Sequence, residues 1–358
     1  MIISDSNFLG ELDEQKPSTA PGLLSKQEKD LLIERTFVGL YRWYVSRSQK
    51  TRNWNPNTDF DWRSLRTDHS AALNTIVEGF FAVEQYVPDY VLALLKVIRR
   101  SYGRSHFHIR WGAEEEKHSD LWENAILFSR FRSPQWLEEY KHVLRAKEWQ
   151  LPWDNALHMI FYTVIQERAT QVNYLNAGLI AAGKNERPEF AQDQDPVLAQ
   201  VSQVIAVDEA AHYNFFLEGA RLFLYYYPAQ SLEALYDVIK FFAMPAGELI
   251  PDYDHFAEVV ARSAVYGPRE HIRDVLDIAL AQMGINGRLA LRNGIKRIRQ
   301  VPRLEDGNMV DTAIFDVLDY KSVTKKVQQL FGRIKTYEKN VGFDLVYPTN
   351  FVASGLEP

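Results

Sequence analysis

The stretch GAEEEKHSDLW, residues 112–122, decides the fold that we expect for this chain. It contains Glu115 and His118, and residues three apart lie on the same face of a helix. A carboxylate and an imidazole then point at one place, where they can act as oxygen and nitrogen ligands of iron, manganese or zinc. The spacing alone is weak evidence, because about half an occurrence of Glu-x-x-His is expected by chance. An ordinary solvated helix face is the alternative.

The hydrophobic pattern separates the three Glu-x-x-His occurrences in the chain. The pair in EEYKH, residues 138–142, lies off the apolar face of its helix, so we expect it to be solvated. The pairs Glu115-x-x-His118 and Glu209-x-x-His212 lie among large apolar side chains. Burying such groups costs free energy unless they are paired or bind a metal. For either pair alone, a buried salt bridge or a hydrogen-bonded core histidine remains an equal alternative.

Two further glutamates, Glu84 and Glu167, occupy the same kind of apolar helix face. Pro88 follows the first of them and is expected to kink that helix or free a carbonyl. The chain therefore alternates twice between a glutamate helix and a Glu-x-x-His helix, and antiparallel hairpins bring such residues to one level. Four inward carboxylates and two imidazoles form the di-iron or di-manganese site of ferritin-like bundles. The predicted metal ligands are Glu84, Glu115, His118, Glu167, Glu209 and His212.

An acidic residue directly precedes each of the two buried Glu-x-x-His pairs, Glu114 the first and Asp208 the second. A histidine that binds a metal needs an acceptor for its other ring nitrogen. We predict that Asp208 holds His118 across the bundle and that Glu114 holds His212.

Composition narrows the chemistry that this chain can perform. Its 358 residues are 46% hydrophobic and carry a net charge of −6, which gives no reason to expect a nucleic-acid partner. The absence of cysteine excludes disulfides, thiolate zinc sites, iron–sulfur clusters and cysteine nucleophiles. Any metal must therefore be held by oxygen and nitrogen.

The pattern along the chain is that of an all-α protein, because alternating runs typical of strands are absent. We expect an irregular arm over residues 1–25, one helical domain over 26–335 and an irregular tail over 336–358. No apolar stretch is long enough to cross a bilayer, and the acidic N-terminus lacks the basic region of a signal peptide. These features predict a cytoplasmic protein without a transmembrane segment.

Short segments along residues 35–280 then match one family in order. They include AEEEKHSDL (113–121), DEAAH (208–212), QERAT (166–170), VEQYVPDY (83–90), NWNPNTDF (53–60), MPA (244–246), DHF (254–256) and AVYGPREH (264–271). In these segments the chain resembles the soluble acyl-acyl-carrier-protein desaturases, typified by plant stearoyl desaturase. The chain from Met283 onward matches poorly, and Ala210 and Ala211 stand where the family usually has basic residues.

The resemblance implies a ferritin-like four-helix bundle with additional helices, two iron ions and a homodimer. It also implies activation of O₂ and formation of a cis double bond in an acyl chain carried on acyl carrier protein, with electrons from a ferredoxin-type donor. Trp54 matches a tryptophan on the electron route towards His118 and Asp208, and Thr170 a threonine beside the oxygen-binding side of the metals. Without those roles, Trp54 would be a core aromatic residue and Thr170 a helix threonine bonded to its own i−4 carbonyl.

Docking of an acidic carrier protein requires positive charge. Two basic clusters are candidates, and a solvated surface is an equal alternative for both. The first is Arg288, Arg292, Lys296 and Arg299, and the second is Arg99, Arg100 and Arg104.

Two other functions remain open, because fold does not settle the reaction. One is a di-iron oxygenase that hydroxylates a carrier-bound substrate, and the other is an iron-storage or ferroxidase-like protein. Chain length and the segment after the bundle argue against the second.

Overall fold

The structure is a computed structural model that describes residues 21, 24–302 and 313–346. Every regular element that it describes is a helix, so the predicted all-α class is confirmed. Most of the expected N-terminal arm, residues 1–25, lies outside the described residues. None of the described helices is both long and apolar enough to cross a membrane.

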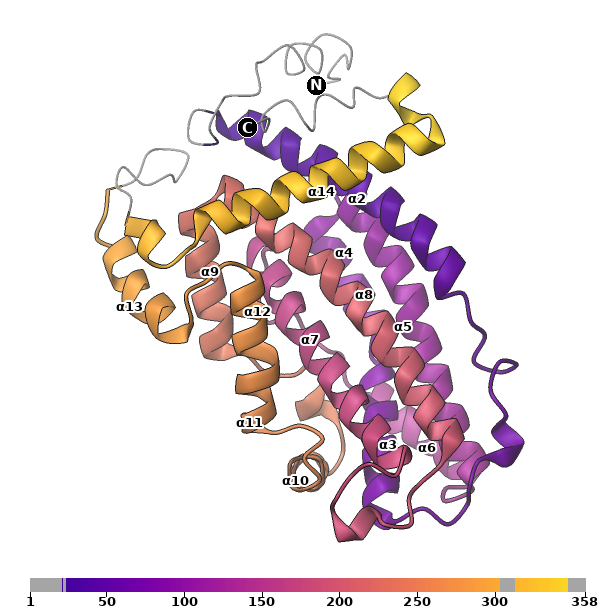
Figure 1. Cartoon of the computed structure of the whole chain (residues 1–358). Coiled ribbons are helices and arrows are strands. Elements are labelled where there is room, and N and C mark those ends of the chain that lie inside the picture. Colours follow the sequence, from indigo (N-terminus) through magenta and orange to yellow (C-terminus); the bar gives the residue numbers. More distant parts are fainter. Residues whose placement is uncertain (1–20, 22–23, 303–312, 347–358) are drawn as a thin grey trace.

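The centre of the fold is a bundle of long helices that run side by side (Figure 1). Three of these helices begin at a polar cap: Ser70 accepts from the Leu73 amide, Asn155 from the His158 amide, and Asp195 from two amides of its helix. Such caps satisfy amides that have no partner within the helix. The bundle helices are α3 (Ala71–Glu84), α4 (Val87–Ile98), α5 (Tyr102–Ser129), α7 (Ala156–Ala181) and α8 (Pro196–Tyr226).

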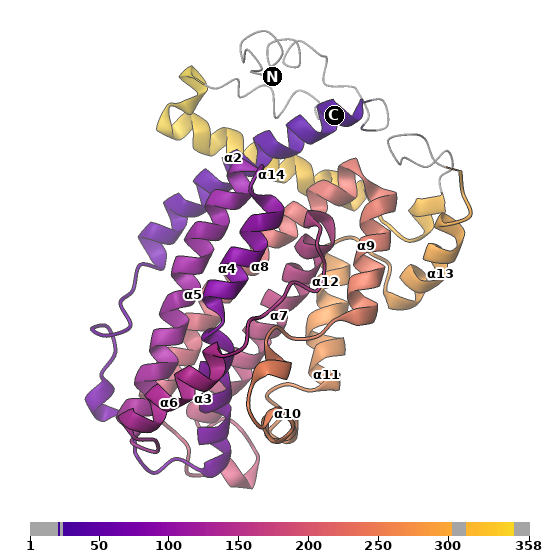
Figure 2. The ribbon, with the colours of Figure 1, turned by 180° about the vertical axis from the view of Figure 1, so that it is seen from behind.

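The kink expected at Pro88 is a complete break between α3 and α4. Glu84 is the last residue of α3, and Pro88 stands in the first turn of α4, where its missing N–H costs no hydrogen bond. The hydroxyl of Tyr90 donates to the carbonyl of Val83 at 2.9 Å and so satisfies one acceptor at the break. Seen from behind, α3 and α4 follow one another along α5 (Figure 2). The break places Glu84 at mid-height in the bundle.

Two further long helices pack against the bundle. Helix α2 (Lys26–Thr51) packs on α5 and α8, and α14 (Tyr320–Val341) packs across α8 and α2. A buried ion pair of 2.7 Å joins Arg35 to Glu338 between these two helices. Because α14 is helical as far as Val341, the irregular tail that we predicted from residue 336 starts too early. The helix ends where Gly342 adopts a φ of 82°, a conformation that glycine tolerates.

Shorter helices cover the remaining faces. A six-residue π-helix, His271–Leu276, precedes α12, and Arg168 of α7 donates to the carbonyl of Asp274 within it. The other elements are η2 (Trp62–Ser64), α6 (Pro134–Arg145), η3 (Pro188–Phe190), α9 (Pro228–Phe241), η4 (Gly247–Leu249), α10 (Tyr253–Arg262), α11 (Pro268–Glu270), α12 (Asp277–Gln282), α13 (Arg288–Ile298), η6 (Ala313–Asp316) and η7 (Phe343–Leu345). The buried apolar residues form one continuous cluster through the bundle and these covering helices.

Candidate metal centre

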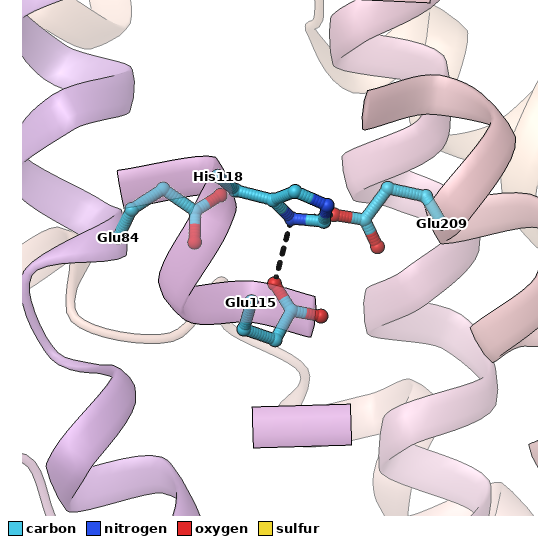
Figure 3. A group of neighbouring side chains, drawn as sticks. All are labelled: Glu84, Glu115, His118 and Glu209. Atoms are coloured by element: carbon cyan, nitrogen blue, oxygen red, sulfur yellow. Dashed lines mark hydrogen bonds and ion pairs between the residues drawn. The ribbon is translucent and has the colours of Figure 1, made fainter. Parts of the chain in front are cut away.

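The structure brings all six predicted ligands together in the middle of the bundle. They come from the four helices that we predicted, and every one is buried. Glu84 ends α3, Glu115 and His118 lie in the middle of α5, Glu167 lies in α7, and Glu209 and His212 lie in α8. Figure 3 shows four of them, Glu84, Glu115, His118 and Glu209, converging from α3, α5 and α8.

Two overlapping groups of side chains in this cluster have the geometry of metal sites. One joins the carboxylates of Glu84, Glu115 and Glu209 with His118, and the other joins Glu115, Glu167 and Glu209 with His212. Within each group one ligand atom per residue lies within 4.8 Å of all the others. Because Glu115 and Glu209 belong to both groups, they are positioned to bridge two cations.

The oxygens of the shared glutamates point in opposite directions. Glu115 presents Oε2 to Nδ1 of His118 at 3.0 Å and Oε1 to Nδ1 of His212 at 2.9 Å. Glu209 presents Oε1 to Nδ1 of His118 at 3.5 Å and Oε2 to Nδ1 of His212 at 3.6 Å. Each bridging carboxylate therefore offers one oxygen to each half of the centre.

Several ligand atoms in this cluster have no hydrogen-bond partner among the described residues. The clearest are Oε2 of Glu167 and both carboxylate oxygens of Glu209, which lie 3.4–3.6 Å from a histidine nitrogen. Leaving such atoms buried and unpaired costs about 1–3 kcal/mol each, and more for charged groups. Oxygen and nitrogen donors suit iron, manganese or zinc, so the residues fit a pair of such ions.

The pKa shifts of the clustered carboxylates also indicate a site for positive charge. Burial, followed by the charge of Glu115, raises the pKa of Glu84 to about 8. Burial and the same neighbour also raise the pKa of Glu209 well above its ordinary value. Burial opposes ionisation of Glu115 as well, but His118 and His212 outweigh it and lower that pKa to about 2. Four carboxylates this close ionise together only when positive charge lies between them.

The outer nitrogen of His118 faces Asp208, as we predicted. Nε2 of His118 lies 3.4 Å from Oδ2 of Asp208, and the same oxygen accepts a hydrogen bond of 3.2 Å from the Trp54 indole. The ring of Trp54 is nearly parallel to that of His118, with centroids 6.2 Å apart. Arg52 pairs with the other oxygen of Asp208 at 3.1 Å. These contacts fix the orientation of the imidazole.

The outer nitrogen of His212 faces Glu114 in the same way. Nε2 of His212 lies 3.0 Å from Oε2 of Glu114, and Tyr44, Ser48 and Arg110 also donate to this carboxylate. Despite burial, His212, Ser48 and Tyr44 hold the pKa of Glu114 below its ordinary value.

Three buried residues around Glu114, at the C-terminal end of α2, were not predicted from the sequence. Tyr44 and Ser48 lie one turn apart in α2 and Arg52 is the capping residue that follows it, so their spacing of four gives a polar stripe along one side. Such a stripe on a buried face is the signal by which the sequence could have shown them. Two more aromatic residues also contact the cluster: Trp111 donates to Glu167 and Tyr174 donates to Glu84.

The contact between Asp208 and His118 leads to a test of metal retention. Asp208→Ala is expected to lower metal affinity about 10–100-fold, because the imidazole loses the group that orients it. Asp208→Asn keeps an acceptor oxygen and is expected to recover part of that affinity. Titration of the purified variants with ferrous iron measures both effects. Wild-type affinity in Asp208→Ala would show that Asp208 does not hold the histidine.

Comparison with known proteins agrees with this geometry. The sequence profile of the fatty acid desaturase family matches residues 70–302, which is more than half of the chain. The chain belongs to the fatty acid desaturase family. The four helices that carry the six candidate ligands begin and end within the matched region, whereas α2 precedes it.

Relatives of this desaturase-family chain occur in bacteria and plants. DesA1 of Mycobacterium tuberculosis, provisionally named an acyl-acyl-carrier-protein desaturase, is 25% identical over 224 residues, which cover 60% of this chain and 62% of DesA1. Stearoyl-acyl-carrier-protein 9-desaturase 6 of Arabidopsis thaliana is 28% identical over 222 residues, 58% of this chain and 54% of the plant protein. The chain therefore spans less than two thirds of the length of these relatives.

A solved structure supports the fold of this desaturase-family chain. The crystal structure of DesA2 from Mycobacterium tuberculosis superimposes with a TM-score of 0.52 at 17% identity. The match covers 73% of this chain and 98% of DesA2. It supports the helical architecture that surrounds the candidate metal centre.

Two other sequence predictions have different outcomes in this desaturase-family chain. Glu139 and His142, the Glu-x-x-His pair in residues 138–142, are exposed, as predicted. The hydroxyl of Thr170 donates to the backbone carbonyl of Gln166 at 2.9 Å and accepts from the side-chain amide of the same residue at 3.1 Å. Both hydrogen bonds therefore stay within α7. These bonds are those of the alternative that we gave, and a role for Thr170 in the reaction rests on the resemblance alone.

Proposed function

We propose that this chain is an O₂-dependent di-iron desaturase that introduces a cis double bond into an acyl chain carried on acyl carrier protein. The observation that supports this best is the pair of carboxylate–histidine groups that share Glu115 and Glu209. Membership of the fatty acid desaturase family supplies the class of reaction, and the Arabidopsis relative is named for a stearoyl chain on acyl carrier protein.

Each ligand has a distinct part in the proposed site. Glu84 and His118 would hold one iron, Glu167 and His212 the other, and the two shared glutamates both. The bound irons would supply the oxidative O₂ chemistry that an unactivated C–H bond requires and that no side chain provides. Asp208 and Glu114 keep the histidines oriented, and the buried apolar faces of the four helices exclude water from the reacting groups.

A small apolar pocket lies next to the centre, between α2, α4, α5, α7 and α8. Its free volume is about 20 Å³, so an acyl chain would enter it only if the lining side chains moved apart. Phe216 in its wall is one turn beyond His212, and Thr163 is one turn before Glu167. The other lining residues are Phe37, Leu94, Ile98, Arg104, His108, Ala156, Met159, Ile160 and Phe215. We propose that the substrate chain approaches the centre along this apolar lining and displaces these side chains as it binds.

Electrons would come from a ferredoxin-type donor through Trp54. This half-buried indole links the surface segment after α2 to Asp208 and His118. We also propose, from the resemblance and the composition, that the protein is a homodimer in the cytoplasm.

A product assay tests the proposed reaction. Stearoyl, palmitoyl and shorter chains on acyl carrier protein are incubated with iron-loaded protein, a ferredoxin system and O₂, and the released acids are analysed by mass spectrometry. Desaturation removes two hydrogens from the chain, whereas a hydroxylase adds one oxygen. Iron oxidation without any change to the acyl chain would contradict the proposal and indicate a ferroxidase-like protein.

The basic face of α13 gives a separate prediction about carrier docking. Arg288 and Arg299 lie near acidic residues of neighbouring elements, whereas Arg292 and Lys296 are exposed with no ion pair to another described residue. Reversing the charge of both, Arg292→Glu with Lys296→Glu, is expected to raise the KM for carrier-bound substrate about 10-fold through weaker steering of the acidic carrier. Steady-state kinetics at low salt measure this.

The same charge change elsewhere provides the control for this prediction. Lys321→Glu with Lys325→Glu alters two exposed lysines one turn apart on α14 and is expected to leave the KM unchanged. An unchanged KM in the α13 variant would eliminate this face as the docking site and leave the cluster of Arg99, Arg100 and Arg104.

A further inference from the structure

The two histidines of the centre are supported by arms of the same design. On one side, a single oxygen of Asp208 faces both the Trp54 indole N–H and Nε2 of His118. On the other, Oε2 of Glu114 accepts from the Tyr44 hydroxyl and lies 3.0 Å from Nε2 of His212. Each arm thus runs from an oxidisable aromatic ring through one carboxylate oxygen to a candidate metal ligand.

Tyr44 has the surroundings of a side chain whose oxidation is controlled. It is only 3% exposed, and its ring packs edge-on against Phe107 and Phe215, with centroids 4.9 and 5.8 Å away. The guanidinium of Arg52 lies 4.9 Å from the ring centroid. Shielding of this kind protects a radical from solvent, and the carboxylate beside the hydroxyl gives the phenolic proton a place to go.

A cation also lies over each of the two aromatic rings. Arg52 lies by Tyr44, and the ammonium of Lys117 lies 3.9 Å from the ring centroid of Trp54. A nearby cation opposes the accumulation of positive charge on a ring. Loss of an electron from Tyr44 is therefore favourable only together with loss of its proton, which the hydrogen bond to Glu114 allows.

We propose that Tyr44 is a one-electron redox residue of the centre, coupled to it through Glu114 and His212. The inference rests on the proposed function. The oxidant is dioxygen, whose reduction to water takes four electrons: the two ferrous ions would supply two, Tyr44 one, and the ferredoxin-type donor (excess ferrous iron in the test below) the fourth. Tyr44 gives up one electron along the Glu114–His212 path, its O–H bond breaks, and the proton passes to Oε2 of Glu114. A neutral tyrosyl radical remains, and one electron from a ferredoxin-type donor restores the phenol as the proton returns.

The proposal gives α2 a role that the family match does not assign, because Tyr44 lies outside residues 70–302. Tyr174 is the competing candidate, since its hydroxyl donates directly to Glu84. Tyr44 contacts a candidate ligand, His212, only through the carboxylate of Glu114, whereas Tyr174 contacts the candidate ligand Glu84 directly. Variants of the two tyrosines show whether the radical forms specifically at Tyr44 or at any tyrosine near the metals.

Radical formation without acyl substrate is the direct test. The full chain is loaded anaerobically with ferrous iron, mixed with O₂, frozen within seconds and studied by electron paramagnetic resonance. The wild type is expected to give an organic radical signal that narrows when all tyrosines are ring-deuterated. The signal is expected to fall to background in Tyr44→Phe and to persist in Tyr174→Phe and Trp54→Phe. A radical signal that persists in Tyr44→Phe would overturn the proposal. So would a wild-type protein whose iron is oxidised but which gives no radical signal.

Two further measurements separate the possible failures. Iron content and the optical spectrum are recorded first: protein that binds and oxidises iron without forming a radical rejects the role of Tyr44 but leaves the proposed function intact. Protein that binds no iron rejects both. Should Tyr44→Phe fail to hold iron, a fluorotyrosine placed only at position 44 keeps the hydroxyl. Its fluorine couplings must then appear in the radical signal, and an unchanged signal would reject Tyr44.

Discussion

His118→Ala is expected to lower turnover more than 100-fold, whereas His142→Ala, in the same Glu-x-x-His spacing, is expected to leave it unchanged. His118 is fully buried, and its Nδ1 faces Glu115 and Glu209. Loss of a group that merely orients a metal-binding histidine costs about 10–100-fold, so loss of the histidine itself should cost more. Turnover is measured with carrier-bound substrate, a ferredoxin system and O₂.

His142→Ala is a matched control because it removes the same side chain from the same motif on an exposed face of α6. Iron content is measured alongside turnover, and circular dichroism checks that both variants fold. Equal losses in the two variants would mean that the effect is general, and near wild-type turnover in His118→Ala would remove this histidine from the centre.

Ferrous iron is expected to raise the unfolding temperature of the metal-free chain by about 10 °C. A ligand that binds only the folded state at 100 times its Kd stabilises it by about 2.7 kcal/mol, and two such sites by about 5 kcal/mol. For a domain of this size, 1 kcal/mol shifts the unfolding temperature by about 2 °C. The reason is local: without a cation, the two buried oxygens of Glu209 have no hydrogen bond to any described residue. Differential scanning calorimetry with and without iron measures the shift.

Glu209→Gln is the control variant for this stability prediction. Removing one charge from a crowded group of buried carboxylates should leave the metal-free chain equally stable or more stable by about 1–3 kcal/mol. The same change should remove most of the response to iron. Loss of metal-free stability together with an undiminished response to iron would contradict the assignment of Glu209 as a bridge.

The ligand set was largely predictable from helical periodicity. Glu115 and His118 share a face with large apolar residues, as do Glu209 and His212, and all four are buried. The same criterion rejected Glu139 and His142, which are exposed. Periodicity succeeds here because a charged group on an apolar face must have a partner that the local sequence does not supply.

Contacts between distant segments were harder to predict. Tyr44 meets Glu114 across 70 positions of sequence, and nothing within α2 alone indicates which helix its polar stripe faces. The end of α14 was also misjudged. The irregular tail was predicted from residue 336, whereas α14 continues to Val341 and ends at Gly342, whose positive φ is typical of a glycine that ends a helix. The hydrogen bonds of Thr170 depend on a side-chain rotamer, which the motif does not specify.

Metal content of single-ligand variants tests most directly whether two irons share Glu115 and Glu209. The wild type is expected to hold two irons per chain. Glu84→Ala and Glu167→Ala, which each alter only one group, should retain one iron. Glu115→Ala, which alters both groups, should lose both. If Glu115→Ala retains one iron, as the single-group variants do, the two irons do not share this carboxylate and the proposed bridged centre is wrong.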